Sequence, residues 1–210
     1  MDLQAILDNP IVQDIISEIT ARCEDQTSHQ DDYGWLEEVI HDLQVIERGE
    51  TKTVLIYRDW DFVIKIPNYY AYPKYDYCKL ESDKYQSAKD CGIEKLLLET
   101  AYLITAGCID LYVQPRFSCA ATEHESMRKA SRKTHNLENK KIVRKIAKTT
   151  YDGYRIDSVW LARALQLYGK KFFLRFEKWS HENRVGDLHR NNVGWLKGKP
   201  IILDYSGYYG

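Results

Sequence analysis

Apolar residues near the start of the chain follow the spacing of amphipathic helices. Ile11, Ile15 and Ile19 recur every four residues, which places them on one face of a helix. Asn9-Pro10 directly before them is a typical helix start, because asparagine caps the first turn and proline adopts its backbone geometry. A second helix is predicted over 33–41, after a polar loop. We expect the two helices to pack on the body of the domain.

From residue 43 the pattern changes to short runs of β-branched and aromatic residues separated by polar turns. Such runs are typical of β-strands, and the first three indicate an antiparallel meander. The five predicted strands are 43–46, 53–57, 62–66, 96–106 and 109–117. Between the third and fourth, residues 77–90 have helical spacing and end before Gly92, a typical C-terminal cap.

Two charged residues fall on inward-facing positions of this region. Lys65 lies inside the apolar third strand, and Glu81 lies on the apolar stripe of the helix over 77–90. A buried charge is costly unless it meets an opposite charge, so we predict that the two side chains pair. The alternatives are an edge strand with Lys65 in solvent, and Glu81 as a solvated residue beside Lys84 or Lys89.

The second half of the chain begins with a strongly basic run and then becomes apolar. Residues 128–148 hold nine lysines and arginines against a single acid, Glu138, as expected of a solvated helix face or a mobile loop. The same run could bind an acidic partner or a nucleic acid. A long apolar helix is predicted from Asp157 with a break at Gly169, followed by a hairpin of 193–196 and 201–203 around the turn 197–200.

Composition and charge narrow the class of protein. The 210 residues suffice for one large domain or two small lobes, and the formal net charge of −1 gives no general attraction to nucleic acid. No apolar run is long enough to span a membrane, and we see no secretory leader. Five cysteines without C-x-x-C spacing indicate reduced thiols that act as small buried hydrophobes. We therefore expect a cytoplasmic protein with no membrane contact.

Two acidic positions around the terminal hairpin have the spacing that phosphoryl transfer uses. Asp187 lies five residues before Asn192, and an apolar run then leads to Asp204, three residues before Gly207. In such sites one carboxylate accepts the proton of the acceptor hydroxyl, while an asparagine and a second carboxylate hold magnesium. The alternative is an ordinary hairpin with two surface aspartates.

Together these segments resemble the protein-kinase-like fold over residues 43–207. Val185 stands where the H-R-D histidine would be, and Asp204-Tyr-Ser-Gly207 resembles D-F-G, with Tyr205 in place of phenylalanine. The resemblance implies catalytic roles for Asp187, Lys65, Glu81 and His189, magnesium binding by Asn192 and Asp204, and ATP binding by Gly49, Val54, Val63, Lys65, Gln114 and Arg116. The segment from Gln114 to Arg116 would be the hinge that meets adenine.

The loop D-L-H-x-x-N, with His189 in place of the usual lysine, is similar to that of antibiotic phosphotransferases and of compact bacteriophage-encoded serine/threonine kinases. The sequence ends three residues after Gly207, so we expect no activation segment, as in the compact bacteriophage kinases.

The predicted architecture is a two-lobed α+β fold with a five-stranded antiparallel sheet. It divides into a helical extension (1–42), a first lobe (43–117) and a reduced helical lobe with the catalytic hairpin (118–210). The predicted function is ATP- and magnesium-dependent transfer of phosphate to serine or threonine of host proteins in the host cytoplasm. The alternatives are a kinase-like binding protein that inhibits a host partner without catalysis, and a small-molecule phosphotransferase.

Overall fold

The computed structural model describes residues 1–24, 32–46, 51–69, 74–117, 158–185, 188, 192–196 and 198–206. Its contacts divide the chain into two compact units, which are described one at a time. The first unit is Met1–Ser82 with Glu99–Arg116, and the second is Asp83–Leu98 with Phe117–Gly210. The boundary between Ser82 and Asp83 falls inside helix α4 (Tyr77–Asp90).

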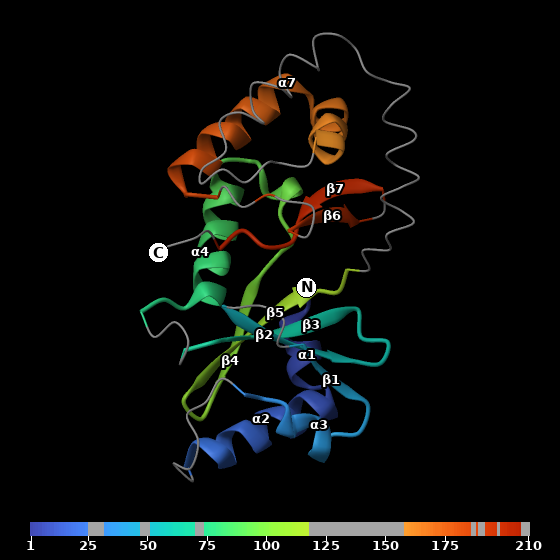
Figure 1. Cartoon of the computed structure of the whole chain (residues 1–210), viewed down its shortest axis with the longest axis vertical. Helices are drawn as coiled ribbons and strands as arrows, with labels where there is room; N and C mark the ends of the chain where they lie inside the picture. Colours follow the sequence, from blue (N-terminus) through green and yellow to red (C-terminus); the bar gives the residue numbers. More distant parts are fainter. Residues whose placement is uncertain are drawn as a thin grey trace. The chain divides into compact units, whose positions relative to one another are not determined.

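The first unit is built on a five-stranded antiparallel sheet (Figure 1). Its strands run in the spatial order β1-β2-β3-β5-β4, so β3 is the central strand. The predicted α+β class and five-stranded antiparallel sheet are therefore confirmed. The strand bounds are β1 Leu43–Ile46, β2 Lys52–Tyr57, β3 Phe62–Pro67, β4 Ala101–Ala106 and β5 Ile109–Pro115.

Three helices cover one face of this sheet (Figure 1). They are α1 (Leu3–Leu7), α2 (Pro10–Glu24) and α3 (Trp35–Val39), the last being shorter than the predicted helix over 33–41. Asn9 Oδ1 accepts a hydrogen bond from the backbone N–H of Ile11 at 3.0 Å, which confirms the predicted helix start. The buried side of α2 and the inner side of the sheet form one continuous apolar core.

The predicted strand over 96–106 is wrong in its first five residues, because strand β4 begins only at Ala101. Residues Glu94–Leu96 form a short 3₁₀ helix, η1. The apolar Leu96, Leu97 and Leu98 are buried in the second unit rather than in the sheet. The backbone N–H of Leu98 donates to the carbonyl of Ile202 at 2.9 Å, so a strand of the second unit takes up the pairing. An apolar run alone does not show which core it enters.

The second unit packs the C-terminal half of α4, the helix α7 and a small hairpin around an aromatic core. Helix α7 (Ser158–Glu182) is broken at Gly169, whose φ of 78° and ψ of 166° are not helical. The break lies where the sequence predicted it. The largest fully buried side chains of this unit are Trp160, Trp179, Tyr205, Phe173 and Phe176.

The terminal hairpin consists of β6 (Val193–Leu196) and β7 (Lys199–Ile202). Strand β7 begins two residues earlier than predicted, which shortens the turn; Gly198 adopts the positive φ that this turn needs (74°). Pro200 lies inside β7 opposite Trp195. A two-stranded sheet tolerates this proline because its strands are both edge strands, where a missing N–H can face outward.

The described cysteines, Cys23, Cys78, Cys91 and Cys108, are all free thiols. Cys78 is buried, and burial raises the pKa of its thiol above the ordinary value. Cys91 and Cys108 are exposed, so the prediction that the cysteines act as buried hydrophobes is wrong for these two.

Two predictions on the second half of the chain, the basic run 128–148 and the helix cap Asp157, lie outside the described residues. Within the described part of the chain, none of the helices combines the length and the apolar character that crossing a bilayer requires.

Gly107, in the turn between β4 and β5, packs closely against helix α2, and a substitution can test this contact. Gly107 has a φ of 59°, and a Cβ added there would lie 2.8 Å from Cys23 Cβ of α2. We expect Gly107→Ala to lower the free energy of unfolding by about 1 kcal/mol from the left-handed backbone and by a further ~1–3 kcal/mol from overpacking. Urea unfolding followed by circular dichroism measures the change.

Gly92→Ala is the matched control for this substitution. Gly92 has a similar φ of 65°, but its added Cβ would meet only Arg175 Nη1 at 3.5 Å, an ordinary contact. We expect the backbone cost alone, about 1 kcal/mol. Equal losses in the two variants would contradict the packing of Gly107 against α2.

Candidate nucleotide-binding and metal-binding residues

One face of the five-stranded sheet gathers most of the described nucleotide-binding residues predicted from the sequence. In the antiparallel ladder Val54 of β2 lies opposite Lys65 of β3, and Val63 lies opposite Gln114 of β5. Directly opposed residues project from the same side of a sheet. Because side chains alternate along a strand, Lys52 of β2 shares this side with Val54. We call the surface formed by Lys52, Val54, Val63, Lys65 and Gln114 the lysine face.

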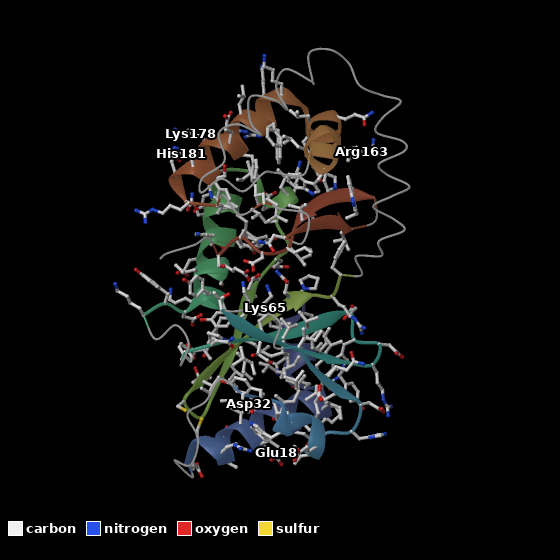
Figure 2. All side chains as sticks on the ribbon, viewed as in Figure 1. Glu18, Asp32, Lys65, Arg163, Lys178 and His181 are labelled. Carbon is white, nitrogen blue, oxygen red and sulfur yellow. The ribbon has the colours of Figure 1, made fainter. Side chains whose placement is uncertain are left out.

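The lysine face carries a buried cluster of charges that Glu81 of α4 completes. Lys65 Nζ donates to Glu81 Oε2 at 2.7 Å, which confirms the predicted pairing of these two side chains. Lys52 Nζ donates to the other oxygen, Oε1, at 2.6 Å. Glu81 is 0% exposed and each lysine is 5% exposed. Figure 2 labels Lys65 on the sheet of the first unit.

Neutral side chains extend this cluster along the sheet. Thr100 Oγ1 donates to Glu81 Oε2 at 3.4 Å, and Gln114 Nε2 donates to Thr100 Oγ1 at 3.0 Å. All of these groups are buried. The alternative that Lys65 lies in solvent on an edge strand is wrong, because β3 is the central strand and Lys65 is buried. The alternative that Glu81 is solvated is also wrong, because Glu81 is 0% exposed.

The start of α4 is fixed to the lysine face, which positions Glu81. Asp76 caps the helix, since its Oδ1 accepts from the backbone N–H of Lys79 at 2.7 Å. Its Oδ2 accepts from the hydroxyl of Tyr112 at 2.9 Å, and Tyr112 lies opposite Lys65 in the ladder. Burial, and then the hydrogen bond to Asp76, raise the pKa of Tyr112 above its ordinary value, so the hydroxyl remains a donor.

Lys52 is a member of the cluster that the sequence did not reveal. The second strand was predicted to begin at Thr53, one residue later than it does, which left Lys52 outside the strand. The available signal was the alternation of β2, in which Lys52 stands two residues before Val54 and so points to the same side. That signal could be read only after the start of the strand was known.

An apolar platform adjoins the charged cluster on the same face. Ile46 of β1 lies opposite Val54 and is 36% exposed, although it is a large apolar residue. Ile46, Val54 and the buried Val63 share this side of the sheet, and apolar side chains of this kind line the sites that bind aromatic bases. A hollow on the β1 side of this platform is lined by Asp42, Gln44, Ile56, Arg58 and Arg116. The sequence did not identify Ile46.

Arg116 has a structural role in the first unit that the hinge prediction did not foresee. Its backbone N–H donates to the carbonyl of Asp61 at 2.6 Å. Its guanidinium donates to the carbonyl of Arg58 and, at 3.4 Å, to that of Trp60. These bonds tie the end of β5 to the turn between β2 and β3. The backbone donor of Arg116 is therefore already used inside the sheet.

The second unit brings the two predicted metal ligands together. The carbonyl of Asn192 accepts from the backbone N–H of Leu203 at 2.8 Å and from that of Asp204 at 3.5 Å. Asn192 directly precedes β6 and Asp204 follows β7, so the two residues lie at the end of the hairpin opposite its turn. Both are half-buried. Asp204 Oδ1 also accepts from Ser206 Oγ at 3.0 Å and from Ser206 N at 3.3 Å, which orients the carboxylate.

The segment after β7 is held by buried hydrogen bonds on both sides of Asp204. Lys84 Nζ, on the α4 portion of this unit, donates to the carbonyl of Ser206 at 2.5 Å. The hydroxyl of Tyr205 donates to the carbonyl of Leu98 at 2.6 Å, and Tyr205 is 1% exposed. Trp160 Nε1 of α7 donates to the carbonyl of Ile201 at 3.1 Å. The position of Asp204 is therefore determined by the core of its own unit.

Four predicted residues, Gly49, Asp187, His189 and Gly207, lie outside the described part of the chain. Within that part, no group of three or more histidine, cysteine, aspartate or glutamate side chains is arranged to hold a metal ion. A site built from Asn192 and Asp204 belongs to another class, because it takes one carboxylate and one amide oxygen from the protein.

The donor sets fit a nucleotide and its metal when each unit is considered alone. Two buried ammonium groups beside an apolar platform, of which Ile46 is the exposed member, match a triphosphate and a base. A carboxylate and an asparagine side chain on neighbouring strand ends match magnesium, which prefers oxygen ligands and retains several waters or phosphate oxygens.

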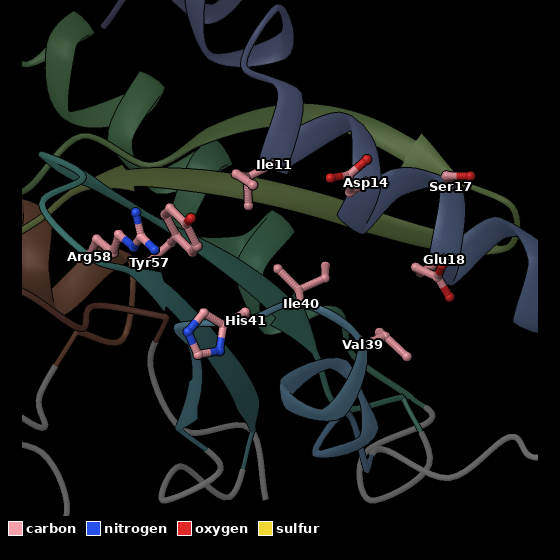
Figure 3. Close-up of a pocket in the computed structure, with 9 residues that line it drawn as sticks. All are labelled: Ile11, Asp14, Ser17, Glu18, Val39, Ile40, His41, Tyr57 and Arg58. Atoms are coloured by element: carbon pink, nitrogen blue, oxygen red, sulfur yellow. The ribbon is translucent and has the colours of Figure 1, made fainter.

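A separate pocket in the first unit lies among the N-terminal helices (Figure 3). Asp14 and Glu18 of α2 line one part of it, and His41 and Arg58 line another. None of the described nucleotide-binding residues predicted from the sequence lines this pocket. The chemistry of the lysine face therefore does not extend to it.

Comparison of the chain with models of protein families, with curated proteins and with solved structures found no match.

Proposed function

We propose that the protein is a phosphotransferase that uses ATP and magnesium. The observation that carries the proposal is the ion pair of Lys65 and Glu81, which joins the central strand of the sheet to α4 and is almost completely buried. Burying two charges costs several kcal/mol by order of magnitude, so a buried ion pair is poorly explained by a contribution to stability alone. A lysine held on a sheet face by a glutamate is well placed to bind phosphate.

In this proposal Lys65 binds phosphate oxygens of ATP, and Glu81 fixes the direction of its ammonium group. Ile46, Val54 and Val63 supply the apolar surface for adenine. Gln114 and Thr100 continue the hydrogen-bond network that holds Glu81 in place. Each of these roles is argued from contacts inside the first unit.

In the second unit Asn192 and Asp204 would hold magnesium, which neutralises the charge of the phosphates when it is bound. Ser206, by its hydrogen bonds, keeps the carboxylate of Asp204 oriented. Asp187 is proposed to accept the proton of the attacking hydroxyl, a role that rests on its spacing from Asn192. His189, in the same loop, is proposed to lie next to the transferred phosphate.

The resemblance to compact bacteriophage-encoded kinases supports a serine or threonine of a host protein as the acceptor. The D-L-H-x-x-N loop also supports a small hydroxyl compound as the acceptor. The two acceptors differ in the product, since a labelled protein appears only in the first case.

A second candidate function is a kinase-like protein that binds a host partner without catalysis. The observation that favours it is the use of the Arg116 backbone N–H by Asp61, because this hinge donor is then withdrawn from adenine. In that case the cellular effect of the protein would persist in the Asp204→Ala variant. Loss of the effect in that variant would favour catalysis.

Transfer of label from γ-labelled ATP to the protein itself or to a cell extract, in the presence of magnesium, tests the main proposal. We expect labelling by the wild type and at least roughly 100-fold slower labelling by Asp187→Asn, because the acceptor hydroxyl loses its base. Labelling that continues unchanged in Asp187→Asn would contradict the proposed role of Asp187. Asp8→Asn is the matched control, because Asp8 is an exposed residue at the C-terminal end of α1. Asp76→Asn would not serve, because Asp76 caps α4.

A further inference from the structure

We propose that Lys52 is a second phosphate-binding lysine, so that ATP phosphates are bound by two ammonium groups, one from β2 and one from β3. The inference rests on the proposed phosphotransferase function and deepens it. The prediction from the sequence assigned this role to Lys65 alone. The structure adds Lys52 at the same carboxylate, with a contact as short as that of Lys65.

The first argument is the arrangement of the two lysines on one carboxylate. Each ammonium group donates to its own oxygen of Glu81, at 2.6 Å for Lys52 and 2.7 Å for Lys65. The two groups are therefore held side by side, from neighbouring strands, by a single acceptor. A lysine ammonium has three N–H donors, so it can bind more than one acceptor at a time.

The second argument is charge. Lys52 and Lys65 each bring a positive charge to this face, and both contact the carboxylate of Glu81. Burial makes a charged group costly, and an anionic ligand lowers that cost. Two ammonium groups held side by side therefore offer a polyanion more charged N–H donors than Lys65 alone does.

The third argument is position. Lys52 is at the start of β2 and two residues before Val54, which belongs to the apolar platform. The start of the strand is fixed, since Thr53 Oγ1 donates to Asn68 Oδ1 at 3.1 Å and Asn68 N donates to the carbonyl of Thr51 at 3.1 Å. Lys52 thus extends from a rigid backbone on the same face as the surface proposed for adenine.

Calorimetric titration of the full-length protein with ATP and with adenosine, without magnesium, tests the inference. We expect Lys52→Met to weaken ATP binding roughly 10- to 100-fold, the usual effect of losing a charge-assisted hydrogen bond, and to change adenosine binding less than about twofold. Lys65→Met should act in the same direction. Lys178→Met on α7, whose side chain is 77% exposed, removes one lysine elsewhere and should leave both affinities unchanged.

The ratio of the two affinities separates a phosphate contact from a structural role. Partial unfolding of a variant lowers ATP and adenosine binding by the same factor, so it does not alter the ratio. Lys52→Gln provides a second, polar replacement in case the methionine variant does not fold. A ratio changed at least about tenfold in either folded variant supports the inference.

Three results would overturn the inference, and they differ in what else they overturn. Wild-type protein that binds ATP while Lys52→Met binds it equally well removes the role of Lys52 and leaves the phosphotransferase proposal intact. Wild-type protein that binds neither ATP nor adenosine removes both. Equal losses of ATP and adenosine binding in Lys52→Met would give Lys52 only a structural role at Glu81.

Discussion

Replacing Asp204 with asparagine is expected to lower the rate of phosphate transfer from ATP at least about 100-fold, with little change in the free energy of unfolding. Asp204 Oδ1 accepts from Ser206 Oγ at 3.0 Å and from Ser206 N at 3.3 Å, and an asparagine oxygen accepts the same bonds. Only the carboxylate carries the charge that favours magnesium. Single-turnover transfer from labelled ATP and urea unfolding measure the two quantities.

Asp90→Asn is the matched control for this variant. Asp90 is an exposed residue at the end of α4, where its Oδ1 accepts from Gln86 Nε2 at 3.5 Å. The same chemical change there should leave the rate of transfer unaltered. Wild-type activity in Asp204→Asn would contradict the metal-binding role of Asp204. A loss of more than about 2 kcal/mol of stability would instead show that the carboxylate is structural.

The second large effect is expected on stability. Glu81→Gln should lower the free energy of unfolding by about 3–5 kcal/mol, because it leaves Lys52 and Lys65 buried without the carboxylate that both contact. Glu81 is 0% exposed, so water at this position does not solvate the two ammonium groups in place of the carboxylate. Urea unfolding measures the loss, and the urea m-value shows whether the compactness of the folded or denatured state has changed.

A surface ion pair and a triple variant serve as controls for Glu81→Gln. Glu182→Gln breaks the exposed pair with Lys178 (3.7 Å) and should change stability by less than about 0.5 kcal/mol. Replacing the whole cluster by Lys52→Met, Lys65→Met and Glu81→Leu should restore most of the stability, because apolar residues do not need paired charges. This variant should not bind ATP. A loss of stability as large as that of Glu81→Gln would contradict the electrostatic explanation.

The pairing of Lys65 with Glu81 could be predicted from the sequence, while the participation of Lys52 could not. Two opposite charges on the apolar sides of consecutive elements have few ways to be satisfied except by each other. Lys52, in contrast, lies at the boundary of a strand, and strand boundaries are poorly determined by local pattern. An error of one residue moves a side chain from the sheet into a turn, or from one face to the other.

The residues around Leu97 show a second limit of local pattern. The run Leu96-Leu97-Leu98 is as apolar as a buried strand, and it was predicted to extend β4. In the structure its hydrogen bonds and apolar contacts belong to the second unit, through Ile202. Hydrophobicity indicates that a segment is buried but not which partner buries it.

The sequence by itself determined the periodicities and therefore the elements: a capped α2, five strands, a helix ending before Gly92, a break at Gly169 and a terminal hairpin. These follow from local geometry and from the burial of apolar side chains, which a linear pattern records. The tertiary structure decided the ladder register and the packing of α4. They alone place Lys52 beside Lys65 at Glu81, because contacts between residues far apart in the chain depend on which surfaces meet.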